Sequence, residues 1–385
     1  MYIPMRLAKK VVLVFLTLAI TFVACRKVDT IGDDEILRKY LNVPHSPFSY
    51  TQYPLPQFFN GQFVTIQNNT PGDNVTTDWG ATLGRVLFYD KRLSRNLSIS
   101  CASCHDQKFG FADTAQFSKG FDGRFTRRHS MALANATFYI SGRFFWDERA
   151  ATLEEQVLTP IQDPIEMGMR LDSLVERLRA TEFYPILFKN AFGTPEITET
   201  GISRALAQFV RSMVSYRSKY DQGRSLVADS EMGFPNFSVQ ENLGKHIFLK
   251  NTNVNCAGCH NTDVFITDNP RNNGISLNNE DSGVFVHTQD VMDVGKFKAP
   301  SLKNVAIRGR YMHDGSIQGL GELLDHYNSG IHPNSNLDPH IIDKDGKPAR
   351  MNLTVTELEA LKAFLETLTD HEMIKDERFS SPFID

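Results

Sequence analysis

The pentapeptides Cys101-Ala-Ser-Cys104-His105 and Cys256-Ala-Gly-Cys259-His260 decide how this chain of 385 residues is built. In a C-x-x-C-H run the two thiols can add to the vinyl groups of a haem, while the adjacent imidazole ligates the iron from the same side. A zinc site or a redox dithiol is the alternative, but too few further cysteines remain to complete a four-thiolate zinc site for each pair. The sequence therefore predicts two covalently bound haem c groups, with His105 and His260 as proximal iron ligands.

Each motif is preceded by a related segment, so the chain contains an internal repeat. Leu83-Gly84 and Leu87-Phe88 stand before the first motif, and Leu243-Gly244 and Ile247-Phe248 stand before the second. Each copy predicts a helix that leads into a haem-binding loop. Apolar residues at intervals of three and four predict further helices over 152–158, 171–180, 202–216 and 356–368, the last with Thr356 as its N-cap.

These patterns define the expected fold class. We predict a mainly α-helical protein with few short strands, in which two cytochrome c-like haem domains follow one another in tandem. The first is expected at about 76–235 and the second at about 236–385.

The composition agrees with a large globular protein and argues against some functions. Hydrophobic residues make up 41% of the chain, and 28 phenylalanines provide aromatic side chains that can line apolar pockets. The 41 basic residues are outnumbered by 45 acidic residues and form no long basic run. Binding to nucleic acid is therefore not expected.

The N-terminus resembles an export signal. Lys9 and Lys10 precede an apolar run over 11–24, which is short for a membrane span but has the length of a signal-peptide core. The run ends in Thr21-Phe22-Val23-Ala24-Cys25, which resembles a bacterial lipobox; an ordinary signal peptide cut near Ala24 is the alternative. We expect residues 1–25 to be a signal peptide, residues 26–75 to be a tether and extended wrap, and the protein to be periplasmic and anchored through lipidated Cys25.

Further motifs are spread along both expected haem domains. They are Leu83-Gly84 with Leu87-Phe88-Tyr-Asp90, Phe145-Trp146-Asp147-Glu148-Arg149-Ala150, Pro160-Ile161 with Glu166-Met167, Lys298-Ala-Pro300-Ser301-Leu302-Lys-Asn304 and Tyr311-Met312-His313-Asp314-Gly315. From Asp78 to Asp370 the chain thereby resembles the bacterial di-haem cytochrome c peroxidase family. That family also includes MauG, an enzyme that matures a tryptophan-derived quinone cofactor.

The resemblance implies that peroxide reacts at the first haem and that the second haem passes electrons to it. Cleaving peroxide requires an open iron position and a group that moves a proton from the near oxygen to the far one. Glu166 matches the family's distal acid–base residue, although a solvated loop carboxylate is the plainer interpretation. Gln156 and Pro160 match the residues beside it. Trp146 matches the tryptophan between the haems, where its ring would shorten the path for electron transfer; interface packing is the alternative, and both can hold.

The distal ligand of the second haem separates subtypes of the family. Ordinary members have Met at a fixed distance after the histidine of the Tyr-x-His-Asp-Gly motif, whereas the MauG branch has Tyr there. Counted from His313, that position is Tyr327, which we expect as the ligand, with Met312 and His326 as alternatives. A Tyr ligand favours oxidised iron and implies activity without a prior reduction step.

Two departures from the family concern calcium and the resting state. Where many members have Arg-Asn-Ser this chain has Arg128-His129-Ser130, and two carbonyls of the family's inter-haem calcium site map onto Arg308 and Arg310. Imidazole and guanidinium groups suit a hard cation poorly, so the sequence disfavours calcium. We expect His129 to be an interface residue, with ligation of the first haem as the alternative. The loop 108–127 contains no His, which predicts an open iron at the first haem.

The leading prediction is an enzyme that reduces hydrogen peroxide to water, with electrons from a small cytochrome c or cupredoxin. A MauG-like oxidation of a protein side chain is the second interpretation. A non-catalytic di-haem electron carrier is the third, but a carrier would not need Glu166, Gln156 and Pro160 on a distal wall. Because members of the family commonly dimerise, a homodimer is a further expectation.

Overall fold

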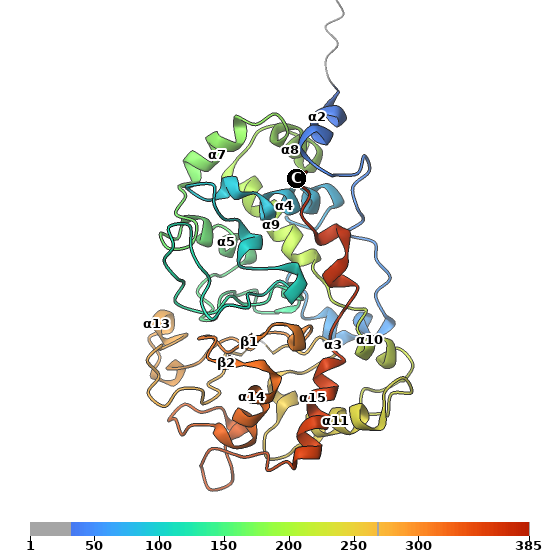
Figure 1. Ribbon diagram of the computed structural model, residues 1–385, viewed down its shortest axis with the longest axis vertical. Helices are drawn as coiled ribbons and strands as arrows, with labels where there is room; N and C mark the ends of the chain where they lie inside the picture. Colours follow the sequence, from blue (N-terminus) through green and yellow to red (C-terminus); the bar gives the residue numbers. More distant parts are fainter. Residues whose placement is uncertain (1–31, 268, 385) are drawn as a thin grey trace, which may run out of the picture.

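The computed structural model describes residues 32–267 and 269–384 (Figure 1). The expected signal peptide and Cys25 lie outside these residues. The described part is mainly helical, with one antiparallel pair of short strands, β1 (Arg310–Tyr311) and β2 (Ile317–Gln318). Within the same ranges no helix is long and apolar enough to cross a membrane. The prediction of a mainly helical fold with few short strands is confirmed.

The helices fall into two successive groups. The N-terminal segment forms α2 (Asp33–Tyr40) and α3 (Gln62–Thr65), and the first half forms α4 (Asp78–Tyr89), α5 (Leu153–Gln156), α6 (Thr159–Gln162), α7 (Leu171–Arg179), α8 (Tyr184–Phe192) and α9 (Glu199–Ser212). The second half forms α10 (Lys219–Arg224), α11 (Val239–Lys250), α12 (Cys256–Cys259), α13 (Phe285–Thr288), α14 (Gly319–Asp325) and α15 (Val355–Glu366).

Short 3-10 turns and one π-helical turn connect these helices. The π-helical turn is η8 (His326–Gly330), which continues α14. The 3-10 turns are η1 (Gln57–Asn60), η2 (Lys91–Leu93), η3 (Cys101–Ser103), η4 (Gln107–Phe109), η5 (Ala136–Phe138), η6 (Val291–Asp293), η7 (Val305–Ile307), η9 (Pro339–Ile341), η10 (Met373–Lys375) and η11 (Glu377–Phe379).

The predicted helices are present, with corrections to their bounds and to the N-terminal segment. The helix predicted over 202–216 begins at Glu199 and ends at Ser212, and the segment predicted to be extended over 26–75 contains α2. The helix expected over 152–158 is the short helix α5, and a separate helix α6 begins at Thr159. The last long helix is capped by Thr354 and not by Thr356, because Glu357 lies three residues after Thr354 and completes a capping box.

The two halves are built on the same helix crossing (Figure 1). In the first half α4 packs against α9, and in the second half α11 packs against α15. A Cβ atom added to Gly84 would lie 2.0 Å from the carbonyl oxygen of Ala205, and one added to Gly244 would lie 1.9 Å from that of Ala360. Each Leu-Gly pair of the repeat is therefore the point at which two helix backbones meet too closely for any side chain.

Each half also closes through an asparagine in the left-handed backbone region, which Asn tolerates better than most residues. Asn135 (φ 66°) donates its N–H to the carbonyl of Met213 at 2.8 Å and accepts from the N–H of Ser215 at 2.8 Å. Asn304 (φ 62°) makes the same two bonds with Leu368 at 3.0 Å and Asp370 at 2.8 Å. The repeat therefore also includes the contact between each asparagine and the residues that follow the long helix of its half, which is α9 in the first half and α15 in the second.

Two hydrophobic clusters form the core of the molecule. One consists mainly of residues between Leu37 and Tyr216, together with Val264 and Ile266, and the other consists of residues between Tyr220 and Leu368. The C-terminal tail runs from the second half back to the first, because Met373 and Phe379, which follow α15, are buried in the first cluster. In Figure 1 the chain accordingly ends beside α4 and α8. The division near residue 235 stays a prediction.

Candidate functional site

The first C-x-x-C-H motif lies on η3, which begins after Ser100. The side chains of Ser100 and Ser103 form a reciprocal cap around this turn. The Nδ1 atom of His105 lies 3.0 Å from the carbonyl oxygen of Phe111, which has a left-handed backbone (φ 62°). This contact occupies one ring nitrogen and leaves Nε2 as the candidate iron ligand.

The second motif lies on α12, whose N-terminus is capped by the side chain of Asn255. Burial lowers the pKa of His260 to about 4, opposed by the carbonyls of Phe265 and Pro300, so the imidazole is neutral and able to coordinate iron at pH 7. Phe265 has a left-handed backbone (φ 56°), as Phe111 has in the first half. The two motifs therefore share a left-handed phenylalanine after the histidine, but among the described residues Nδ1 of His260 has no hydrogen-bond partner, whereas Nδ1 of His105 does.

A cavity of about 160 Å³ lies against the second motif. The two thiols and the imidazole of that motif face it, as do Trp146, Met312 and Tyr327. Helices α11, α14 and α15 contribute the apolar walls, which consist of Phe248, Leu323, Leu324, Leu361 and Leu365.

The residues around this cavity fit a haem group. Arg271, Lys298 and Arg308 line it, and the Nε atoms of both arginines are buried without a hydrogen-bond partner among the described residues. The two propionates of a haem accept such donors. All four motif cysteines are free thiols. The thiols, the imidazole, the apolar walls and the unpaired guanidinium N–H groups are thus the set that a covalent haem requires.

Met312 and Tyr327 approach the cavity from different elements. Met312 follows β1 and has a left-handed backbone (φ 72°), whereas Tyr327 lies in the π-helical turn η8. The side-chain amide of Asn273 donates to the sulfur of Met312 at 2.9 Å. Burial raises the pKa of Tyr327, and a hydrogen bond with Asn273 opposes this increase. His326 is buried, and its Nε2 lies 3.1 Å from the carbonyl oxygen of Asn273.

Glu166 lies in a tightly held loop of the first half. Its carbonyl accepts from the N–H of Phe121 at 2.9 Å, and its N–H donates to the carboxylate of Asp163 at 3.1 Å. A Cβ atom on Gly120 would lie 1.7 Å from the carbonyl oxygen of Ile165, so the two loop strands touch backbone to backbone. The loop therefore has little freedom, and the direction of Glu166 is set by its neighbours.

The environment of Glu166 suits proton transfer near neutral pH. Burial raises the pKa of Glu166 to about 7, with a further increase from Asp163 and a decrease from Arg149. Burial, with the charge of Glu166 among the smaller causes, raises the pKa of Cys101 to about 12 and that of Cys104 to about 11. The Glu166 carboxylate is thus within electrostatic range of the first haem motif.

Gln156 and Pro160 lie on the two short helices before this loop. Gln156 is the half-buried last residue of α5. Pro160 stands in the first turn of α6, and its carbonyl accepts from the N–H of Met167 at 3.2 Å. Pro160 therefore helps to hold the Glu166 loop, and the chemical roles of both residues stay predictions.

Trp146 joins the two halves. Its indole N–H donates to the carbonyl of His129 at 2.7 Å, and its own carbonyl accepts from the N–H of Lys298 at 2.8 Å. The N–H of His129 in turn donates to the carbonyl of His313 at 2.8 Å. Trp146 thus lines the second cavity while it is hydrogen-bonded to the first half, a position that serves packing and electron transfer alike.

Ion pairs that sequence reasoning missed surround Trp146. Asp147 pairs with Arg128 at 2.6 Å and with Arg149 at 2.9 Å. Glu148 and Lys298 form a buried pair at 2.9 Å. The pairing of Asp147 with Arg128 and of Glu148 with Lys298 could not be predicted, because each pair joins segments that are distant in the sequence. Asp147 and Arg149 lie within one motif, but their spacing alone does not show that they form an ion pair.

The residues that departed from the calcium pattern have protein partners. His129 is buried, with Nδ1 3.0 Å from the carbonyl oxygen of Ala115, in agreement with an interface role. Arg308 donates to the carbonyls of Ser301, at 2.7 Å, and Lys303, and burial lowers the pKa of Arg308 to about 10. His129 and Arg308 are thus engaged with protein carbonyls at the positions whose side chains led us to disfavour calcium. That expectation stays a prediction.

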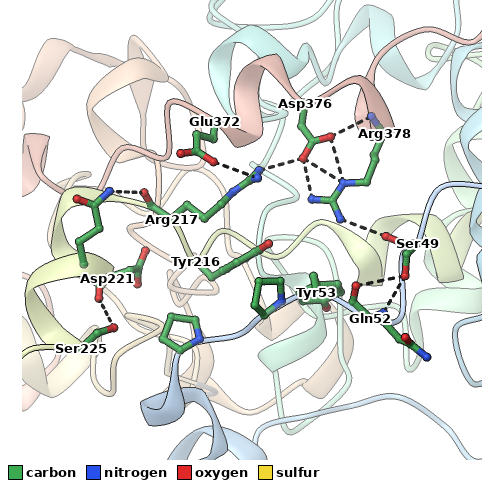
Figure 2. Close-up of a pocket in the computed structure, with 13 residues that line it drawn as sticks. Ser49, Gln52, Tyr53, Tyr216, Arg217, Asp221, Ser225, Glu372, Asp376 and Arg378 are labelled. Atoms are coloured by element: carbon green, nitrogen blue, oxygen red, sulfur yellow. Dashed lines mark hydrogen bonds and ion pairs between the residues drawn. The ribbon is translucent and has the colours of Figure 1, made fainter.

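A larger open hollow of about 690 Å³ lies where three segments meet (Figure 2). They are the N-terminal wrap around Ser49, the segment from Tyr216 to Ser225 and the C-terminal tail. Arg217 pairs with Glu372 at 3.2 Å and with Asp376 at 2.9 Å, and Arg378 also pairs with Asp376. The guanidinium groups in this hollow are already paired, and the hollow contains none of the predicted site residues, so it is best described as a joint between segments.

Comparison with known proteins gives concordant results. A sequence model described as di-haem cytochrome c peroxidase matches residues 79–226. Methylamine utilization protein MauG of Methylorubrum extorquens is 35% identical over 305 residues, which are 77% of this chain and 80% of the relative. Cytochrome-c peroxidase IdrP1 of Pseudomonas sp. (strain SCT) is 28% identical over 332 residues, or 78% of this chain and 84% of the relative.

A solved structure is similar as well. It is the crystal structure of a MauG-like protein associated with microbial copper homeostasis, with 32% sequence identity and a TM-score of 0.72. The match covers 86% of this chain and 99% of that protein. The sequence resemblance and the fold therefore agree.

Proposed function

Because the chain belongs to the di-haem cytochrome c peroxidase and MauG family, we propose that it is an enzyme that reduces hydrogen peroxide to water. The electrons come from a small periplasmic donor, a cytochrome c or a cupredoxin, and pass through the second haem to the first. Membership of the family implies two haems, and the haem iron supplies the centre at which peroxide binds and is cleaved.

Glu166 carries the proposal, because its pKa of about 7 suits a group that must both accept and donate a proton. As a carboxylate it takes the proton from the near oxygen of peroxide. As a carboxylic acid it hands that proton to the far oxygen, which leaves as water. The loop contacts of Phe121 and Asp163 hold its backbone in place during this exchange.

Trp146 supports electron transfer between the halves, because its ring lines the second cavity while its N–H is bonded to the first half. Replacing Trp146 by Phe should leave both haems attached and slow the passage of electrons to the first haem. The measurement is the rate at which the first haem is reduced after rapid mixing with a reduced donor. An unchanged rate would assign Trp146 to packing alone.

A second candidate function is the oxidation of a side chain on a partner protein, as in MauG. Tyr327 favours it, because a tyrosine at this position is typical of the MauG branch and Tyr327 lines the second cavity. In this reaction the electrons come from the partner's side chain and no small donor is needed.

The test begins with the absorption and electron paramagnetic resonance spectra of the purified, oxidised protein. We expect a high-spin ferric signal that shifts when peroxide or cyanide is added. Turnover with reduced cytochrome c supports the peroxidase. Peroxide consumption that reduced cytochrome c does not accelerate supports side-chain oxidation. Two six-coordinate irons that do not react with peroxide would contradict both enzymatic functions and would support a non-catalytic electron carrier.

We also propose that the protein is exported and anchored to a membrane through lipidated Cys25, on the sequence pattern before that cysteine. Replacing Cys25 by Ala should prevent lipidation and remove the protein from the membrane fraction. The expected homodimer stays a prediction that sedimentation can test.

A further inference from the structure

Three side chains near the second haem motif could ligate its iron, and one residue, Asn273, lies beside them. The side-chain N–H of Asn273 donates to the sulfur of Met312 at 2.9 Å. Tyr327 lines the same cavity as Asn273. The carbonyl oxygen of Asn273 lies 3.1 Å from Nε2 of His326. Asn273 also lines the cavity itself. The alternatives left open by the sequence therefore share a single neighbour.

The Asn273 side chain has a defined orientation. Its oxygen accepts from the N–H of Ile275 at 3.2 Å, as in an asparagine-initiated turn. With the oxygen occupied by the backbone, the amide N–H₂ is the part that faces Met312. One of its hydrogens is donated to the thioether sulfur of Met312.

We propose that Asn273 is a positioning residue that selects Tyr327 as the distal ligand of the second haem by holding the sulfur of Met312 in a hydrogen bond. This inference rests on the proposed function only in that a haem is attached at the second motif.

The geometry of Met312 explains why a restraint is needed. Its backbone is held in a tight turn, because its carbonyl accepts from the N–H of Gly315 at 3.3 Å and its φ is 72°. The Met side chain is unbranched and flexible, so rotation about its own bonds can move the sulfur within the cavity. A hydrogen bond to the sulfur engages one of its two lone pairs and must be broken or rearranged if the sulfur is to move to the iron. Asn273 therefore acts on the atom that competes with Tyr327.

Tyr327, in contrast, is directed by the helix that precedes it. It lies four residues after Leu323 and three after Leu324, both of which line the cavity, so it continues the same helix face. The π-helical turn η8 begins at His326, and such turns are frequent at functional sites. The helix thus presents Tyr327 to the cavity without help, and the role of Asn273 is to restrain its competitor Met312.

The test replaces Asn273 by Leu, which has similar volume and no hydrogen-bonding group, in the holoprotein with both haems attached. Ligation of the oxidised second haem is read from near-infrared magnetic circular dichroism and electron paramagnetic resonance. Losing one hydrogen bond to the sulfur should shift the Tyr to Met partition about tenfold toward Met. A far-red sulfur-to-iron band should appear, and the second haem should become easier to reduce, as Met-ligated haems are.

Three further variants make the result specific. Asn273→Ser keeps an oxygen for the turn but is too short to reach the sulfur, so it should behave like Asn273→Leu. Asn273→Leu with Met312→Leu should lose the far-red band again. Asn278→Leu, an exposed amide in the same segment, should leave the spectrum unchanged.

An unchanged ligation spectrum and reduction potential in both Asn273 variants would overturn the inference. So would a change of ligand in Met312→Leu alone, since that would make Met312 the ligand of the unmodified protein. The proposed function fails separately, because a protein that exchanges ligands as expected but does not react with peroxide contradicts the peroxidase and supports the role of Asn273.

Discussion

The two halves of the molecule are built around the same repeat and differ in the elements that accompany each C-x-x-C-H motif. Gly84 and Gly244 mark equivalent helix crossings, and Asn135 and Asn304 close equivalent turns. In the first half the additional element is a loop that carries a carboxylate with a pKa near 7. In the second half it is the pair Met312 and Tyr327 beside Asn273. We propose that the repeat provides attachment for the haems and that the segments without a counterpart provide the chemistry.

The largest expected difference between the halves comes from removing one haem at a time. Replacing Cys101 and Cys104 by Ala should remove the first haem and abolish the reaction with peroxide. Replacing Cys256 and Cys259 by Ala should remove the second haem, keep the reaction of the first with peroxide and abolish turnover with the donor. Mass spectrometry counts the haems, and stopped-flow absorption follows the peroxide reaction.

Circular dichroism serves as the control for folding in both double variants. Should the two proteins be folded and lose the reaction with peroxide to the same extent, the division of labour between the halves would be wrong.

The next effect concerns Glu166. Replacing it by Gln removes the proton acceptor at almost constant size, so the reaction of peroxide with the first haem should slow by about a hundredfold or more. The second-order rate of that reaction is the measurement. Glu176→Gln, on the exposed side of α7, is the matched control and should react at the original rate. A Glu166→Gln protein of undiminished rate would remove this carboxylate from the mechanism.

The pH dependence of the same rate sharpens the comparison. Burial raises the pKa of Glu166 to about 7, so the carboxylate form that accepts a proton is present above this pH and is lost below it. The rate should therefore fall about tenfold per pH unit well below pH 7 and be level above it. The acid limb should be missing in Glu166→Gln. An acid limb that survives in this variant would belong to another group.

The smallest expected effect tests whether the two helix crossings are equivalent. Gly84→Ala and Gly244→Ala each push a methyl group against a backbone carbonyl, which should lower the free energy of unfolding by about 1–3 kcal/mol in both cases. Gly321→Ala in α14 meets no atom within 4 Å and should be neutral or slightly stabilising. Thermal unfolding of the holoproteins measures all three. A large difference between the first two variants would show that the crossings are not equivalent.

Much of the frame could be predicted from local sequence. The two motifs, the repeated Leu-Gly pairs and the helix over 356–368 are short patterns whose physical meaning does not depend on distant residues. Even the cap at Thr354 was readable, since Glu357 follows it at capping-box distance. The position counted from His313 led to Tyr327, which does line the cavity together with its alternative Met312.

The rest could not be predicted because it depends on contacts between distant segments. Asn273 is an ordinary polar residue in a loop until the fold brings it to Met312 and Tyr327. The buried, unpaired Nε atoms of Arg271 and Arg308 likewise arise only when the folded chain brings both residues to the second cavity. The spacing of residues along the sequence does not indicate such contacts between distant segments.

The path of the C-terminal tail has a consequence for how the protein matures. Met373 and Phe379 complete the core of the first half, Arg378 donates to the carbonyl of Ser49, and Leu41 pairs with Phe383. Until the C-terminal tail has packed against the first half, the core of that half is incomplete. Cys101 passes through this interval in an unfinished fold, where its thiol is easier to reach than in the completed protein.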